Sequence, residues 1–209
     1  MQRTRDRVGL HGKAPGREPL IFVVRRLLAS IANQRETQMP NSFADLRAAI
    51  VTDIKRHVAG LRDAGVDFYG YAVLPPDYYT AFDPTTIAVA FNCESDIDAS
   101  NHGQTYFRYS VDEWQNYVRD GFDTVNAELK SLLAANRESA DDLIDDDFVE
   151  SIYQTVLDAM KSLRDGGTFN DVQYLVVWLS DSDGDILNRS AKLLNSSEIY
   201  SDFATEFGE

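Results

Sequence analysis

Apolar residues recur at spacings of three and four along residues 43–61, as they do on a helix that buries one face. Ser42 precedes this stretch and Asp45 follows three positions later, a pattern similar to a capping box. Gly65 then supplies a residue that suits the C-terminal end of a helix. The pattern predicts a helix of about six turns. Its buried stripe is Phe43, Leu46, Ile50, Ile54, Val58 and Leu61.

Later segments repeat the helical spacing. They are residues 122–133, residues 148–163 and a last helix that begins near Ser197. Asp145, Asp146 and Asp147 precede the second of these, where negative charge suits the positive end of a helix dipole. A further capping-box pattern at residues 110–113 predicts a short helix that carries Trp114, Tyr117 and Val118.

Other segments have the composition of β-strands. Residues 66–74 and 85–93 are rich in aromatic and β-branched residues, and the stretch between them has no helical pattern, so we expect an antiparallel pair. We expect residues 106–109 to form a short third strand. Residues 172–179 are apolar on both faces, which is typical of a central strand covered on both sides. The order of elements predicts an α+β fold, with a mostly antiparallel central sheet of about four strands and helices packed on it.

The charge of the chain changes character near Met39. Residues 1–38 hold eight of the 20 Lys and Arg residues and three of the 34 Asp and Glu residues, so residues 39–209 hold 12 and 31, a formal net charge of −19. We interpret residues 39–209 as a single acidic globular domain. Residues 1–38 are a basic leader with three readings: a targeting segment, a disordered arm, or an over-extended start before translation at Met39. We favour the last reading, because Met39 leads directly into the first capped helix.

Composition and motifs argue against several classes of function. The acidic charge disfavours binding to nucleic acids, and no run of about 18 apolar residues predicts a membrane-spanning helix. The single cysteine, Cys93, excludes an intrachain disulfide and agrees with a reducing, cytoplasmic location. The chain contains no phosphate-binding glycine loop, dinucleotide fingerprint or Gly-x-Ser-x-Gly elbow. We therefore assign no cofactor and no catalytic residue.

One short polar segment carries candidate metal ligands. Three carboxylates and an imidazole together could bind a divalent ion, and the residues are Glu94, Asp96, Asp98 and His102. Their spacing matches no named motif, and acidic loops are common in so acidic a chain. A catalytic pair of Cys93 and His102 is disfavoured, because acidic neighbours raise the pKa of a thiol rather than lower it.

A second acidic segment resembles the first half of a calcium loop, with Asp181, Asp183 and Asp185 at alternate positions. The loop requires glycine at its sixth position and glutamate at its twelfth, where this chain has Ile186 and Lys192. A turn is the favoured interpretation.

Residues 106–114 combine aromatic, basic and acidic side chains where a strand is expected to meet a helix. One reading is structural: Trp114 is a core residue and Arg108 pairs with Asp112 or Glu113. The other reading is a polar pocket in which Arg108 binds a carboxylate of a partner. The candidate partner-binding residues are Arg108, Asp112, Glu113 and Trp114.

Several segments resemble a bacterial family called domain of unknown function 4303. They are residues 67–72, 91–94, 106–114, 122–129 and 176–181. The resemblance spans roughly residues 42–207 and leaves the basic leader outside. It brings no activity, catalytic residue or cofactor.

Two hypotheses of function follow from the sequence. The first is a soluble bacterial protein-binding module, in the form of an immunity-like inhibitor of a basic toxin domain, because an acidic body attracts a basic protein partner. The alternative is a metal-assisted hydrolase that uses Glu94, Asp96, Asp98 and His102. The sequence leaves the oligomeric state open.

Overall fold

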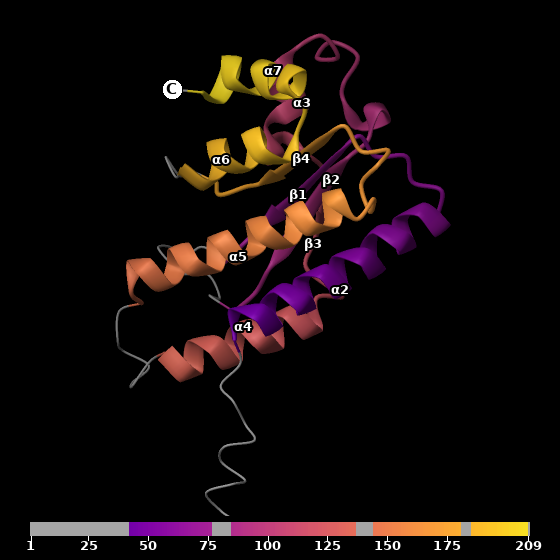
Figure 1. Cartoon of the computed structure of the whole chain (residues 1–209). Helices are drawn as coiled ribbons and strands as arrows, with labels where there is room; N and C mark the ends of the chain where they lie inside the picture. The colour runs from indigo at the N-terminus through magenta and orange to yellow at the C-terminus, as the bar shows by residue number, and fades with distance from the viewer. Residues whose placement is uncertain (1–41, 77–84, 137–143, 181–184, 209) are drawn as a thin grey trace, which may run out of the picture. The chain divides into compact units, whose positions relative to one another are not determined.

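The computed structural model describes residues 42–76, 85–136, 144–180 and 185–208, all of which lie in the unit Pro40–Glu209. Within them, six α-helices and a four-stranded sheet form an α+β fold, as expected (Figure 1). The helices, with two 3-10 turns labelled η, are α2 (Phe43–Asp63), η1 (Glu94–Asp96), α3 (Thr105–Tyr109), η2 (Val111–Glu113), α4 (Asp123–Asn136), α5 (Asp146–Asp165), α6 (Asp185–Leu194) and α7 (Ser197–Phe207). The basic leader, Asp181 and Asp183 lie outside the described residues, so the interpretations of them stay predictions.

Helix α2 is the clearest product of local sequence. The hydroxyl of Ser42 accepts a hydrogen bond from the N–H of Asp45 at 3.2 Å, and the Asp45 carboxylate accepts one from the N–H of Ser42 at 3.0 Å. This reciprocal pair is the predicted capping box. At the other end Gly65 has a φ of +74°, a conformation that glycine adopts readily.

The N-terminus of α4 is held by a side chain of α2. The fully buried carboxylate of Asp53 accepts a hydrogen bond from the N–H of Val125 at 3.1 Å. Its other oxygen lies 3.0 Å from the guanidinium of Arg56. A carboxylate at this position satisfies a free N–H of the first turn and fixes α4 against α2.

The sheet contains β1 (Gly70–Leu74), β2 (Ala88–Asn92), β3 (Asn116–Val118) and β4 (Tyr174–Val177), in the order β3-β2-β1-β4. Strands β1 and β2 are antiparallel, as predicted, and so are β2 and β3. Strand β4 is parallel to β1, so the expectation of a mostly antiparallel sheet is wrong and the sheet is mixed. The reason is the connection: the chain reaches β4 only after crossing over through α4 and α5.

The segment between β2 and α4 differs most from expectation. Residues 106–109 lie in the short helix α3, not in a strand. The predicted helix after Ser110 is instead the turn η2 followed by β3, and the Ser110 side chain makes no capping bond. Helix α6 was not predicted, because its start lies beside the acidic Asp-Gly segment that favours a turn.

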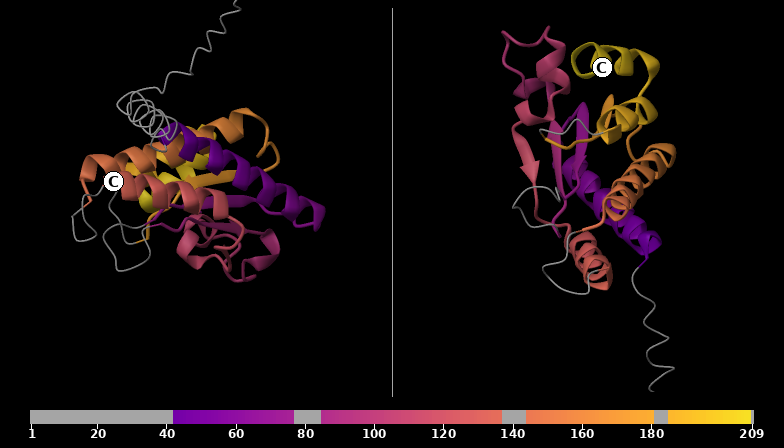
Figure 2. Two further views of the ribbon diagram at one scale, coloured as in Figure 1. Left: turned by 90° about the horizontal axis from the view of Figure 1, so that it is seen from below. Right: turned by 90° about the vertical axis from the view of Figure 1, so that its left-hand side faces the viewer.

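Alternate residues of the strands enter two separate cores. Tyr71, Val73 and Phe91 face a core filled mainly by α2, α4 and α5. Ala72, Ala90 and other residues of the same strands face a second core, which also contains residues of α3, η2, α6 and α7. Helices α3 and α7 lie side by side at one end of this unit, away from α4 (Figures 1 and 2). The sheet is therefore covered on both faces.

Strand β4 is covered on both faces, as predicted, but it is an edge strand rather than a central one. A side chain of α6 and one of the residue that follows it close the outer edge of β4. The Asn195 side chain accepts a hydrogen bond from the N–H of Leu175 at 2.8 Å and donates one to the C=O of Leu175 at 2.7 Å. The hydroxyl of Ser190 accepts a hydrogen bond from the N–H of Val177 at 3.0 Å. These two side chains take the place of a fifth strand.

His57 of α2 contributes a titratable group to the first core. Its Nδ1 lies 2.9 Å from the hydroxyl of the buried Tyr71, and its ring lies near those of Phe91 and Phe122. Burial lowers the pKa of His57 from its ordinary value of 6.5. The imidazole is therefore neutral in the folded protein at neutral pH.

Replacing Asn195 with alanine should lower the free energy of unfolding by about 2 kcal/mol, because both backbone groups of Leu175 lose their partners. Chemical denaturation measures this loss. Asn136→Ala is the matched control, since Asn136 also donates to the carbonyl four residues earlier in its helix but contacts no strand edge. An equal effect of the two substitutions would contradict edge closure by Asn195.

The pH dependence of stability should reveal His57. Because its folded pKa lies below its unfolded value near 6.5, its contribution is fully present above pH 6.5 and is lost as pH falls below it. Between pH 7 and 5 the wild type should lose up to about 1.4 kcal/mol per pH unit relative to His57→Gln. The control His102→Gln, at an exposed histidine, should follow the wild type. Parallel curves for wild type and His57→Gln would show that burial does not oppose protonation.

Candidate functional site

Arg108, at the end of α3, is paired within the molecule. Its guanidinium donates to both oxygens of Glu94, at 2.6 and 3.1 Å, and to the side-chain oxygen of Gln173 at 3.0 Å. It also lies 4.3 Å from the centre of the Tyr69 ring. The hydrogen bond from Arg108 lowers the pKa of Glu94. The expected pairing of Arg108 with Asp112 or Glu113 is therefore replaced by a bidentate pair with Glu94.

Two hydrogen bonds hold the backbone of Arg108. The hydroxyl of Tyr69 and the indole N–H of Trp114 donate to its carbonyl, at 3.0 and 3.3 Å. The amide of Asn92 donates to the Tyr69 hydroxyl at 2.9 Å. Burial raises the pKa of Tyr69 to about 12, so this phenol keeps its proton at neutral pH.

Trp114, a candidate for partner binding, is a core residue with 3 % of its surface exposed. Its ring packs edge-on against Tyr69 and Tyr174. It lies so close to Gly70 that a Cβ on that residue would stand 2.8 Å from the indole. The role of Trp114 in this structure is to fix η2 and β3 on the sheet.

The candidate metal ligands do not gather into one site. Glu94 is engaged by Arg108, and Asp96 accepts a hydrogen bond from the amide of Asn116 at 2.7 Å. The side chains of Asp98 and His102 are exposed. Across the residues that the structure describes, no three His, Cys, Asp or Glu side chains are placed to hold a metal ion.

The thiol of Cys93 is not activated. Burial, reinforced by the charge of Asp96, raises its pKa to about 11. A reactive cysteine needs the opposite shift, because the thiolate is the nucleophile.

Two of the predicted partner-binding residues lie on an exposed surface. The Asp112 carboxylate accepts hydrogen bonds from the indole of Trp178 at 3.1 Å and the hydroxyl of Ser180 at 2.7 Å. Glu113 accepts one from the hydroxyl of Tyr106 at 3.4 Å. Both acids are exposed.

Aromatic rings flank these acids. Tyr106 and Tyr117 are 42 % and 43 % exposed, and together with Leu193 they are the exposed large apolar side chains of the described residues. The ring of Tyr106 stacks on that of Phe207 in α7, with 5.9 Å between centroids. Glu206 of α7 accepts a hydrogen bond from Thr105. We name this face the aromatic–acidic surface, made of Tyr106, Asp112, Glu113, Tyr117, Glu206 and Phe207.

The surroundings of this surface are strongly acidic. Residues 94–120 and 197–208 contain nine Asp and Glu residues against two Arg residues, a formal charge of −7. One of those two, Arg108, is neutralised by Glu94. The surface therefore presents negative charge next to half-exposed aromatic rings.

The sequence did not identify every member of this surface. Tyr117 was expected on a helix, and Phe207 lies in the last predicted helix, for which the sequence indicated no surface role. Phe207 meets Tyr106 through a tertiary contact between residues about 100 positions apart, which no local pattern reports.

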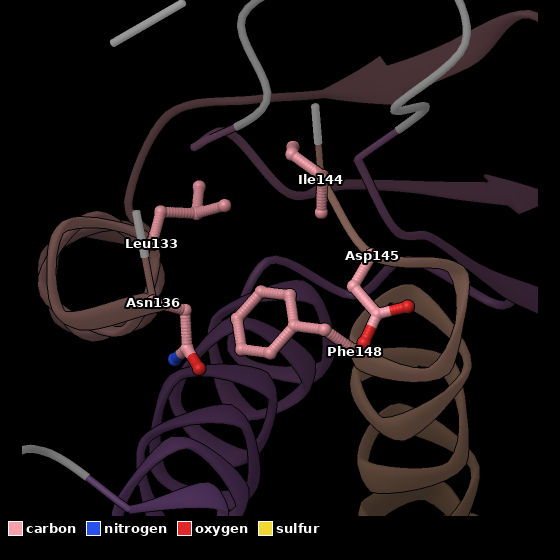
Figure 3. A pocket seen from close by; sticks show the side chains of 5 residues that line it. All are labelled: Leu133, Asn136, Ile144, Asp145 and Phe148. Atoms are coloured by element: carbon pink, nitrogen blue, oxygen red, sulfur yellow. The ribbon is translucent and has the colours of Figure 1, made fainter. Parts of the chain in front are cut away.

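A cavity of about 120 Å³ lies between the end of α4 and the start of α5 (Figure 3). Its lining is Leu133, Asn136, Ile144, Asp145 and Phe148. Such a volume holds a few water molecules and is smaller than the pockets that bind organic ligands, which begin at roughly 300 Å³.

None of the described helices combines the length and apolar composition that a membrane crossing requires.

The contact between Trp114 and Gly70 generates a specific expectation. Gly70→Ala should lower the free energy of unfolding by about 1–3 kcal/mol, because its methyl group would overlap the indole. In a Trp114→Phe background, where the ring is shorter, the same change should cost much less. A double-mutant cycle measured by denaturation tests this coupling, and additive effects would contradict the contact.

A search of curated proteins and a search of solved structures each found no match to the chain. The family model described as Domain of unknown function (DUF4303) matches residues 46–196. The match begins in α2, includes the sheet and the segment from η1 to η2, and ends before α7. On this match over most of its length, the chain belongs to the DUF4303 family, as its sequence segments indicated.

Proposed function

We propose that this domain is a soluble, cytoplasmic protein-binding module of a bacterium, in the form of an immunity-like inhibitor that binds a basic toxin domain. The observation that carries the proposal is the aromatic–acidic surface, where Tyr106 and Tyr117 stand half-exposed beside Glu113. Tyrosine is enriched at the centres of protein interfaces, because it buries a large area at a small cost in side-chain entropy.

Charge supports a basic partner. Residues 39–209 carry a formal charge of −19. Residues 94–120 and 197–208, which surround the aromatic–acidic surface, contribute −7 of this charge. The electrostatic field of this negative charge accelerates the encounter with a basic protein. It disfavours the binding of acidic proteins and of nucleic acids. It also disfavours self-association through this face.

The rigidity of the surface supports a role in binding. Tyr106 is held by stacking on Phe207, and Asp112 is held by two hydrogen bonds. Groups that are already ordered lose little entropy when a partner binds.

The hydrolase hypothesis has no comparable observation in its favour. Two of its four proposed ligands, Glu94 and Asp96, are engaged by Arg108 and Asn116. The protein-binding proposal is therefore the one we retain.

Affinity capture with the full tagged chain, in lysate of its own host, tests the proposal. We expect a basic protein to be retained at low salt and released as the salt rises, because screening weakens charge-driven binding. Glu113→Lys/Glu206→Lys should reduce capture at least tenfold. Asp147→Lys/Glu150→Lys, the same charge change on α5, should reduce it much less. Failure to capture any basic protein, or equal losses in the two variants, would overturn the proposal.

A further inference from the structure

Glu113 lies in a distinctive setting on the aromatic–acidic surface. Its carboxylate accepts a hydrogen bond from the hydroxyl of Tyr106 at 3.4 Å. Tyr117 follows Glu113 by four positions in the sequence. The hydroxyl of Tyr117 donates a hydrogen bond to the carbonyl of Val111. Burial raises the pKa of Tyr117 to about 12, and the nearby charges of Asp112 and Glu113 add to the shift. The carboxylate of Glu113 thus lies close to two tyrosine side chains, Tyr106 and Tyr117.

No cation of the described chain neutralises this carboxylate. The ion pairs among the described residues do not include Glu113, and the nearest candidate in sequence, Arg108, is bound to Glu94. An exposed carboxylate that forms no ion pair among the described residues and lies near two half-exposed tyrosine rings is a suitable environment for a cationic group, which gains from both the charge and the rings.

The two rings are held in place before any partner binds. Tyr106 stacks on Phe207 and meets Phe107 edge-on, with centroids 5.9 and 5.4 Å apart. The hydrogen bond to Val111 fixes Tyr117, and the buried Trp114 anchors the segment between the two tyrosines. An arriving side chain would therefore find preformed walls.

We infer that the aromatic–acidic surface recognises an arginine side chain of the basic partner, with its guanidinium paired to Glu113 and flat against Tyr106 or Tyr117. Arginine suits the site better than lysine, because its planar group stacks on rings and pairs with both carboxylate oxygens. This inference rests on the proposed function and specifies the chemistry that the partner presents.

Titration of the full chain with short peptides, followed by the NMR signals of the tyrosine rings, tests the inference. The probes are a glycine–serine peptide that contains arginines, the same peptide with lysines, and the same peptide with uncharged citrullines. We expect the arginine peptide to bind more tightly than the lysine peptide, and the citrulline peptide to bind at least tenfold more weakly than the arginine peptide. Absence of arginine binding up to about 10 mM, or equal binding of the citrulline peptide, would overturn the inference.

Variants locate the binding. Glu113→Gln should weaken the arginine peptide about tenfold, and Tyr106→Leu or Tyr117→Leu about two- to fivefold. Tyr106→Phe and Tyr117→Phe, which keep the rings but remove the hydroxyl hydrogen bonds, should weaken binding less than the corresponding leucine variants. The control Glu198→Gln, on the same acidic end of the molecule, should stay within twofold of the wild type.

Two outcomes separate this inference from the proposed function. Equal losses for Glu113→Gln and Glu198→Gln would show diffuse attraction without a defined arginine site, which overturns the inference and leaves the proposed function standing. Capture that does not depend on the aromatic–acidic surface overturns the proposed function, whatever the peptides do. Thermal unfolding of each variant verifies that the fold is intact.

Discussion

The indole of Trp114 lies against the backbone of Gly70, and the arrangement of the second core depends on this contact. Any side chain at Gly70 would occupy the space of the ring, since a Cβ there would lie 2.8 Å from it. The indole N–H also donates to the carbonyl of Arg108. One side chain therefore joins three segments: strand β1, the end of α3 and the entry to β3.

This contact explains why the chain between β2 and α4 presents a fixed surface although its helices and strand are short. Elements of three to five residues have little stability of their own and rely on tertiary packing. Trp114 supplies that packing, and the bidentate pair of Arg108 with Glu94 holds the outer side. Tyr106 and Tyr117 remain half-exposed while the Trp114 and Tyr174 rings fill the space above the sheet.

A continuous series of aromatic contacts links the sheet with the surface. Tyr174 of β4 stacks on Phe203, Phe203 stacks on Phe207, and Phe207 stacks on Tyr106. Tyr174 and Phe203 lie in the core and Tyr106 is exposed. Helix α7 therefore connects the buried interior with the candidate interface. The side chain of an interface residue is in this way positioned by the hydrophobic core.

How far the sequence predicted this structure depends on how local each signal is. The capping box and apolar stripe of α2, the acidic start of α5 and the antiparallel pair of β1 and β2 follow from neighbouring residues, and the structure confirms them. The parallel pairing of β4, the strand at Asn116–Val118 and the pair of Arg108 with Glu94 depend on contacts between distant segments. Asp112 and Glu113 were identified from local composition as candidate partner-binding residues, whereas Phe207 joins their surface only through tertiary packing.

Hydrogen–deuterium exchange on the free protein and on its complex with the captured partner tests most directly whether the aromatic–acidic surface is the interface. We expect slower exchange in residues 105–118 and 197–207 when the partner is bound, with little change in α2 and α4. Protection confined to α2, α4 or α5, with residues 105–118 and 197–207 unchanged, would contradict it.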